Sequence, residues 1–245
     1  MTIAQNIISQ TNLRKLHFSL IDPDKQSPNT AGSMADIAEN SGSSAIMVGG
    51  STIVSQRQVD EIVLAIKENS DLPVILFPSG ANYLSKYADA VFFMSLLNSR
   101  NLNYIIREHV KGAHFVKYSG IEPISMGYLI VEPGMTAGRI GEVDLVKRLD
   151  IDTAIGYGLS AQYLGMKFFY LEAGSGANKP VPNDMIKAVK RNIKIPLIVG
   201  GGIRDMKTAK NVALAGADII VTGTTLEKDK NLNQTLKDII QALEV

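Results

Sequence analysis

Leu197-Ile198-Val199-Gly200-Gly201-Gly202-Ile203-Arg204-Asp205 is the stretch that decides the fold, together with Gly216-Ala217-Asp218-Ile219-Ile220-Val221-Thr222-Gly223-Thr224 shortly after it. Each is a short apolar strand that runs into glycine and then into the start of a helix. Glycine lets the backbone come close to a ligand, and the free N–H groups at a helix start attract an anion. Two such loops in succession predict one phosphate clamp, the usual site after strands seven and eight of a (β/α)8 TIM barrel. The alternative is a pair of tight turns that hold no ligand.

The length and composition suit a single barrel over residues 1–245, because about 250 residues are typical of this fold. With 45% hydrophobic and 20% charged residues, the chain has the balance of an ordinary globular protein. A net charge of +1 does not indicate nucleic-acid binding. The absence of cysteine excludes disulfides and thiolate chemistry, and it fits a cytoplasmic location. No apolar run approaches the roughly 18 residues of a spanning helix, so any membrane contact must be peripheral.

Short β-rich runs alternate with longer helical patterns, which predicts a parallel sheet with crossover helices. The eight predicted strands are Leu16–Ile21, Ser44–Val48, Pro73–Phe77, Ala90–Met94, Gly127–Val131, Lys167–Leu171, Pro196–Val199 and Asp218–Val221. The stretch between Phe77 and Ala90 is too short for a crossover helix. We therefore expect an irregular or shortened third unit.

The ends of the first two predicted strands carry candidate metal ligands. Asp22 follows the first strand in Ile21-Asp22-Pro23, and Ser51 follows the second in Gly49-Gly50-Ser51. Active sites of such barrels lie at these strand ends. Magnesium usually takes one or two protein oxygens, with water and substrate phosphates completing its shell. We expect Asp22 and Ser51 to supply that partial shell for Mg²⁺; the alternative is a turn or cap role for each.

Glu172 is the candidate general base. It follows the apolar run Phe168-Phe169-Tyr170-Leu171, so its surroundings should be partly dry. Burial raises the pKa of a carboxylate and makes it a better proton acceptor near neutral pH. The loop Gly174-Ser175-Gly176 then offers backbone donors to a hydroxylated or phosphorylated ligand. The alternative for Glu172 is a buried salt bridge.

Histidines and aromatic residues carry little signal. None of the three histidines has metal-ligand spacing, so structural roles are favoured for His17, His109 and His114. Five aromatic residues fit either an apolar groove or ordinary core packing, namely Tyr83, Tyr87, Phe92, Phe93 and Tyr104.

The ordered set of motifs resembles the geranylgeranylglyceryl phosphate synthases, in particular the second of that family's two groups. The resemblance runs from the first strand to the last and is carried by Ile21-Asp22-Pro23, Val48-Gly49-Gly50-Ser51, Tyr170-Leu171-Glu172, Gly200-Gly201-Gly202-Ile203 and Thr222-Gly223-Thr224. It implies a prenyltransferase that joins the C3 hydroxyl of sn-glycerol 1-phosphate to geranylgeranyl diphosphate and releases diphosphate. The product carries the first ether bond of archaeal-type membrane lipids.

The resemblance also implies roles for individual residues. Asp22 and Ser51 match the magnesium positions, and Glu172 matches the glutamate that takes the hydroxyl proton. The glycerol-phosphate site is matched by Tyr170, Leu171, Glu172, Ala173, Gly174, Ser175, Gly176, Gly201, Gly202, Gly223 and Thr224. One position departs, because Leu20 stands where the family's other group has a lysine for glycerol phosphate. Backbone N–H donors or Lys25 must then supply more of the contacts to glycerol phosphate.

Two other readings share the barrel. A phosphosugar isomerase or lyase would use the same glycine loops but needs no magnesium, and a scaffold that only binds phosphate would show no turnover. The paired-aspartate motif of helical prenyltransferases, Asp-Asp-x-x-Asp, is absent. The resembled family forms dimers and larger rings, so we also expect a homo-oligomer.

Overall fold

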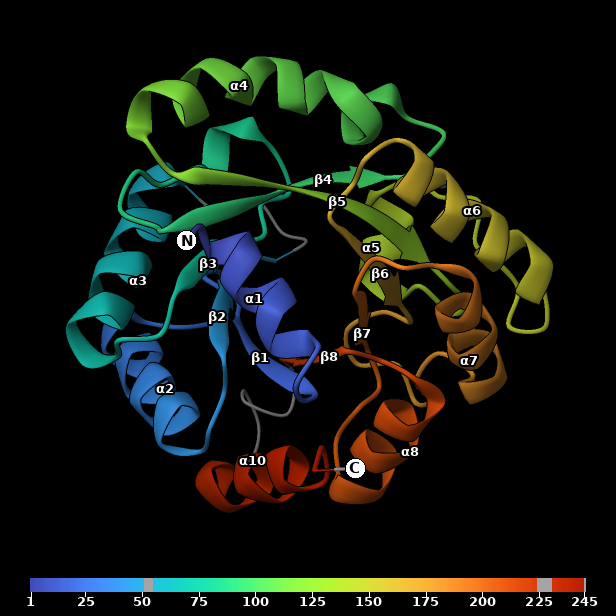
Figure 1. Ribbon diagram of the computed structural model, residues 1–245. Helices are drawn as coiled ribbons and strands as arrows, with labels where there is room; N and C mark the ends of the chain where they lie inside the picture. The colour runs from blue at the N-terminus through green and yellow to red at the C-terminus, as the bar shows by residue number, and fades with distance from the viewer. Residues whose placement is uncertain (51–54, 224–230, 245) are drawn as a thin grey trace.

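Eight parallel strands close into a barrel in the computed structural model, which describes residues 1–50, 55–223 and 231–244. The strands follow one another in chain order, and β8 pairs with β1 to close the barrel (Figure 1). Their bounds are β1 Leu16–Ile21, β2 Ala45–Val48, β3 Val74–Leu76, β4 Ala90–Leu96, β5 Glu122–Ile130, β6 Phe168–Glu172, β7 Leu197–Gly200 and β8 Ile219–Thr222. The predicted (β/α)8 fold is confirmed.

The largest difference from the predicted strands is in β5, which begins at Glu122 rather than Gly127. Its first half pairs with β4 in a register that starts at Ala90 opposite Glu122. Polar residues in this half weaken the apolar pattern. Glu122 also accepts the backbone N–H groups of Ile3 and Ala4, at 2.6 and 3.2 Å, and so ties the N-terminal helix to the barrel.

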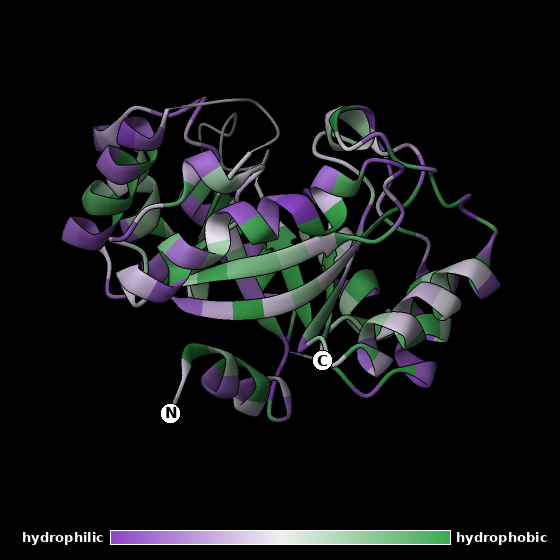
Figure 2. Cartoon of the chain, turned by 90° about the horizontal axis from the view of Figure 1, so that it is seen from above, coloured by the Kyte–Doolittle hydropathy of each residue, from purple (hydrophilic) through white to green (hydrophobic). Residues whose placement is uncertain are grey.

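Helices form the outer ring (Figure 1). Their bounds are α1 Ile3–Thr11, α2 Pro28–Asn40, α3 Gln56–Asn69, α4 Glu108–Ser119, α5 Met135–Ile140, α6 Ile151–Tyr163, α7 Asn183–Asn192, α8 Met206–Ala215 and α10 Leu232–Gln241. Two helices lie outside this ring arrangement: α1 lies beneath the barrel (Figure 2), and α5 lies inside the ring next to β6 (Figure 1), where Ala137 packs against the cluster inside the barrel. Within the described ranges, no helix is long and apolar enough to cross a membrane.

The third unit is irregular, as predicted. Between β3 and β4 the chain forms only a single 3₁₀ turn, η1 (Ala81–Tyr83). The next connection starts with a π-helix, η2 (Asn103–Arg107), which runs directly into α4. The place of a third crossover helix is therefore open at the side of β3 and β4, and this opening shapes the site described below.

Side chains along each strand point alternately into the barrel and toward the surrounding helices. On β6, Phe168 and Tyr170 belong to the cluster inside the barrel, whereas Phe169 and Leu171 pack against the helices. This period of two places the side chain of Glu172 on the inner side at the end of the strand.

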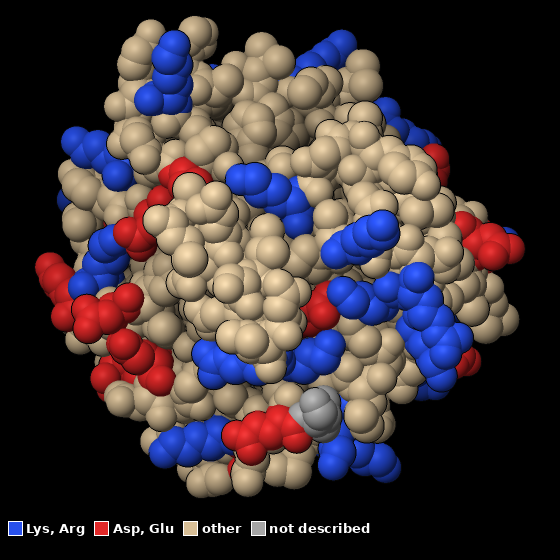
Figure 3. Space-filling model, in the orientation of Figure 1, with Lys and Arg blue, Asp and Glu red and all other residues tan. Residues whose placement is uncertain are grey.

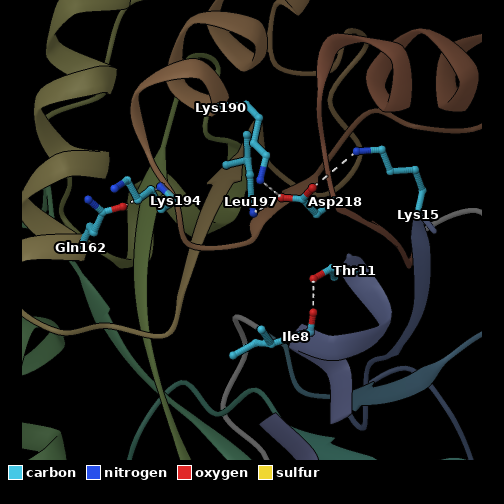
Figure 4. A network of polar contacts seen from close by, with 8 residues as sticks. All are labelled: Ile8, Thr11, Lys15, Gln162, Lys190, Lys194, Leu197 and Asp218. Carbon is cyan, nitrogen blue, oxygen red and sulfur yellow. Dashed lines mark hydrogen bonds and ion pairs between the residues drawn. The ribbon is translucent and has the colours of Figure 1, made fainter. Parts of the chain in front are cut away.

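At the base of the barrel, Asp218 is 5% exposed and fully paired. Lys190 Nζ lies 2.5 Å from its Oδ2 and Lys15 Nζ 3.4 Å from its Oδ1, while the N–H of Leu197 donates to Oδ2 at 2.8 Å (Figure 4). The Gly-Ala-Asp stretch that indicated a phosphate loop thus also carries a structural ion-pair network, which holds β7, β8, α7 and the start of β1 together.

Candidate active site

Glu172 is a buried carboxylate at the rim of the barrel, where only 7% of it is exposed. The N–H of Gly174 donates to its Oε1 at 2.6 Å, and the hydroxyl of Tyr170 forms a second hydrogen bond. Burial raises the pKa of Glu172 to about 7, although both hydrogen bonds act in the opposite direction. Among the described residues no lysine or arginine forms an ion pair with it. The described residues therefore offer Glu172 no partner for the buried salt bridge that was its alternative role.

Glycines make the room in which this carboxylate sits. A Cβ at Gly201 would lie 2.3 Å from Glu172 Oε1, and one at Gly200 would lie 2.1 Å from the Tyr170 hydroxyl. Gly201 also has a φ of +81°, a conformation that side chains rarely adopt. The glycines at the end of β7 thus have two effects. They turn the chain, and they let the backbone approach the Glu172 carboxylate and the Tyr170 hydroxyl.

The glycine loops predicted to bind phosphate meet at one small hollow beside Glu172. Its lining residues are Tyr170, Glu172, Ser175, Gly176, Gly201, Gly202, Ile203, Arg204, Val221, Thr222 and Gly223. Arg204 ties two of the loops together, since its Nη2 donates to the carbonyls of Gly176 at 2.7 Å and Ala177 at 3.0 Å. The loops after β6, β7 and β8 therefore form one pocket with backbone donors and a single acid, which suits a phosphorylated alcohol.

Three predicted binding residues lie around this pocket without lining it. The side chains of Leu171 and Ala173 are buried in the layer between strands and helices. The N–H of Gly174 is already used by Glu172. Any contact of Leu171 or Ala173 with a ligand would have to come from backbone atoms, and their binding roles stay predictions. Thr224 lies outside the described residues.

Asp22 occupies a second hollow at the same end of the barrel. It is 8% exposed; the N–H of Asp24 donates to its Oδ1 at 3.1 Å, and Lys25 Nζ lies 3.1 Å from Oδ2. A Cβ at Gly50 would lie 2.3 Å from Oδ1, so glycine is needed beside the carboxylate. Ser51, the second predicted metal ligand, lies outside the described residues. In the part of the chain that is described, no three His, Cys, Asp or Glu side chains gather into a metal cluster.

An apolar groove fills the opening left by the missing third helix. Its cavity volume is about 140 Å³, and it is bounded by η1, β4 and the inner side of η2 and α4. Phe92, Phe93 and Tyr104 line it, as the groove alternative for the aromatic residues predicted. Tyr83 lines the Asp22 hollow instead, and Tyr87 does not line the groove and is 39% exposed.

The groove borders the Asp22 hollow directly and lies close to the Glu172 pocket. Gly50, Pro78 and Ser79 border the groove and the Asp22 hollow alike. On the other side, the ring of Tyr128 in the groove wall lies 5.0 Å, between centroids, from that of Tyr170 in the Glu172 pocket. A long apolar chain in the groove would therefore reach the Asp22 hollow directly, with the packed rings of Tyr128 and Tyr170 between it and the Glu172 pocket.

His17 is a residue whose connection to the site the sequence did not reveal. Its Nδ1 and Nε2 each lie 2.9 Å from a hydroxyl, of Ser43 and Thr222 respectively. Burial lowers the pKa of His17 to about 3, so the ring stays neutral. Thr222 borders the glycine pocket, and its hydroxyl is held by this ring. The partners are 26 and 205 residues away, and nothing in the local sequence indicates such contacts.

Comparisons with known proteins agree with this geometry. The model of the PcrB family matches residues 8–243. A geranylgeranylglyceryl phosphate synthase of Thermoplasma volcanium is 50% identical over 240 residues, 98% of this chain and 95% of that protein. The enzyme of the same name from Thermococcus sibiricus is 56% identical over 223 residues, 91% of this chain and 88% of that one. The crystal structure of (S)-3-O-geranylgeranylglyceryl phosphate synthase from Thermoplasma acidophilum, in complex with sn-glycerol-1-phosphate, is 44% identical with a TM-score of 0.97, covering 100% and 99% of the two chains.

Proposed function

We infer the function of this chain from its family, because it belongs to the PcrB family. We propose that it is a prenyltransferase that joins the C3 hydroxyl of sn-glycerol 1-phosphate to geranylgeranyl diphosphate, forming an ether bond and releasing diphosphate. The observation that carries this proposal is an apolar groove that shares residues with the Asp22 hollow and is separated from the Glu172 pocket by the packed rings of Tyr128 and Tyr170. A phosphosugar isomerase or lyase would have no use for such an apolar groove.

The glycerol phosphate fits the pocket of the glycine loops. Its phosphate would meet backbone N–H groups after β7 and β8, where close approach depends on Gly201, Gly202 and Gly223. Leu20, which replaces the lysine of the family's other group, packs beside this loop: a Cβ at Gly223 would lie 3.3 Å from Leu20 Cβ. Lys25 is held by Asp22 instead. Backbone N–H groups, rather than Lys25, therefore bind the phosphate that the replaced lysine binds in the family's other group.

Glu172 would accept the proton of the C3 hydroxyl. A base with a pKa of about 7 is matched to working pH. As the proton moves to the carboxylate, the hydroxyl oxygen bonds to C1 of the prenyl chain, and the bond from C1 to the diphosphate oxygen breaks with its electron pair. Tyr170 keeps its proton, because burial and the Glu172 charge raise its pKa, and its hydroxyl orients the carboxylate.

Asp22 and Lys25 stand where the diphosphate would leave. The residues fit a magnesium ion held mainly by substrate, since Asp22 offers one carboxylate and Gly50 leaves room beside it. Bound there with Ser51, magnesium would stabilise the charge that develops on the diphosphate. The Lys25 ammonium adds a second positive charge at the same place. Magnesium dependence and a homo-oligomeric state are proposals that rest on the family resemblance, and a cytoplasmic location is a proposal that rests on the absence of cysteine.

Product formation tests the reaction directly. Geranylgeranyl diphosphate and sn-glycerol 1-phosphate are incubated with magnesium, beside sn-glycerol 3-phosphate and an EDTA control. A prenyl ether formed only with the 1-phosphate and only with magnesium is expected. No ether from folded protein with either isomer would overturn the function, and full turnover in EDTA would overturn the metal role alone.

Asp22→Asn separates the metal role from folding. The variant keeps the shape of the side chain but loses its charge, and we expect turnover to fall at least about 100-fold, the scale of one lost electrostatic contact to the transition state. Glycerol-phosphate affinity, measured by calorimetry, should stay within a few-fold. Near-normal turnover of Asp22→Asn would refute the assignment of Asp22.

A further inference from the structure

The segment formed by η2 and α4 is apolar on both of its sides. Its inner side borders the groove with Tyr104, His109 and Gly112. Its outer side carries four large apolar residues whose exposed fractions are 50% for Leu102, 52% for Ile106, 66% for Val110 and 79% for Tyr118. A helix that is apolar all round is normally buried. In Figure 1, α4 lies at the outer edge of the barrel, and in the described residues no other element lies outside it.

The exposed residues form one stripe along the helix. Ile106 and Val110 are four residues apart, which places them on neighbouring turns of one face. His114 continues the spacing to Tyr118, and its ring stacks on that of Tyr118 at 6.3 Å between centroids. The stripe therefore spans the helix from the π-turn to its C-terminal end.

The charge beside this stripe is positive. Lys111 pairs with Glu108 and Arg100 with Asp144, and the exposed Glu142 accepts a hydrogen bond from Asn101, so these three acids have partners within the chain. Arg107 and Lys117 are exposed and have no acidic partner among the described residues. Lys117 Nζ lies 5.9 Å from the ring centroid of Tyr118, next to the apolar stripe. In Figure 3, blue atoms and no red ones project at the upper rim, where Figure 1 places α4.

We propose that this outer face of η2 and α4 docks on the surface of an anionic lipid bilayer. The proposal rests on the proposed function, in which a C20 substrate and a phospholipid-like product pass through the groove on the other side of the same helix. Apolar side chains on a helix that carries lysine and arginine enter the boundary between headgroups and acyl chains, while the cations meet lipid phosphates. Docking here would bring the groove wall next to the lipid phase that holds both molecules.

A second copy of the chain fits this face less well. An interface with two-fold symmetry uses the same patch on both subunits. Arg107 and Lys117 would then bring four positive charges into one interface, whereas the acids beside the stripe, Glu108, Asp144 and Glu142, already have partners within their own chain. Anionic lipid supplies the opposite charge that this face lacks.

Vesicle co-sedimentation without substrate tests the proposal independently of the reaction. The full chain is mixed with vesicles of phosphatidylcholine, with and without phosphatidylglycerol. The test variant is Ile106→Ser with Val110→Ser, and the matched control is Tyr163→Ser with Leu164→Ser, two residues that are 78% and 72% exposed at the end of α6. We expect the test variant to lose about tenfold or more in binding to anionic vesicles, and the control to keep it.

A second variant tests the contribution of the positive charges to vesicle binding. Arg107→Gln with Lys117→Gln should remove the preference for phosphatidylglycerol and the salt sensitivity of binding. If the wild-type chain stays in the supernatant, or if control and test variants lose binding equally, the docking surface is wrong. A dimer in light scattering that becomes a monomer in Ile106→Ser with Val110→Ser would assign the face to a second copy instead. Vesicle binding without prenyl transfer would overturn only the proposed function.

Discussion

Two buried carboxylates, at opposite ends of the barrel, show how the fold separates stability from chemistry. Asp218 at the base and Glu172 at the rim are almost equally buried, at 5% and 7% exposure. Asp218 has two lysines and a backbone N–H around it. Glu172 has a tyrosine hydroxyl and one N–H, with no cation among the described residues. Equal burial thus serves an ion-pair network at Asp218, where lysines surround the carboxylate, and a proton acceptor near neutral pH at Glu172, where no described cation does.

The strongest test of this comparison removes the charge at the rim. Glu172→Gln keeps the shape of the side chain but cannot accept the proton, so turnover should fall roughly 10²- to 10⁴-fold. The melting temperature should not fall, because no ion pair among the described residues is lost. Calorimetry should show nearly unchanged affinity for sn-glycerol 1-phosphate. Equal losses of affinity and turnover would make Glu172 a binding residue.

The matching change at the base should do the opposite. Asp218→Asn leaves Lys15 and Lys190 without their anion, and we expect the free energy of unfolding to fall by about 2 to 3 kcal/mol. This is less than the roughly 3 to 5 kcal/mol of a fully buried pair, because the two lysine side chains remain 23% and 31% exposed. Urea unfolding measures the loss, and turnover per folded molecule should stay unchanged. Lost turnover with intact stability would contradict the separation of roles.

The pH dependence sharpens the comparison further. In the free enzyme, kcat/KM should rise with pH and level off above about 7, the pKa of Glu172. The folded pKa lies above the ordinary 4.5, so Glu172 favours the folded state below pH 4.5 and loses that contribution as pH rises through 7. The loss approaches about 3 kcal/mol. Because His17 contributes an opposite slope below pH 6.5, the trend is measured as the difference in urea midpoint between the wild type and Glu172→Gln from pH 5 to 8, which should shift against the wild type as pH rises; parallel curves would refute the raised pKa.

Local patterns were enough to predict much of the fold and the candidate pocket. Short apolar runs that alternate with helical patterns marked the strands, and Glu172, directly after one such run, lies in the glycine-lined pocket, as expected. What the sequence could not indicate depends on distant partners. Asp218 contacts Lys15 across 203 residues, and His17 contacts Thr222 across 205. The outer stripe of α4 was hidden for another reason: apolar residues on both faces of a helix look like core. The roles of Asp22 and Ser51 stay predictions.

His17 extends the comparison to a third buried titratable group, whose two ring nitrogens are hydrogen-bonded to the neutral hydroxyls of Ser43 and Thr222. Its folded pKa of about 3 lies below the ordinary 6.5, so the neutral ring contributes stability above pH 6.5 that is lost as pH falls toward 3. The loss should be about 1.4 kcal/mol per pH unit in this range. His17→Gln should remove that slope, and it should weaken glycerol-phosphate binding a few-fold with little change in kcat, because the ring holds Thr222 beside the pocket. Urea midpoints at pH 7.5 and 5.5, with KM and kcat at pH 7.5, check both effects. An unchanged KM would leave His17 as a purely structural link between β1, β2 and β8.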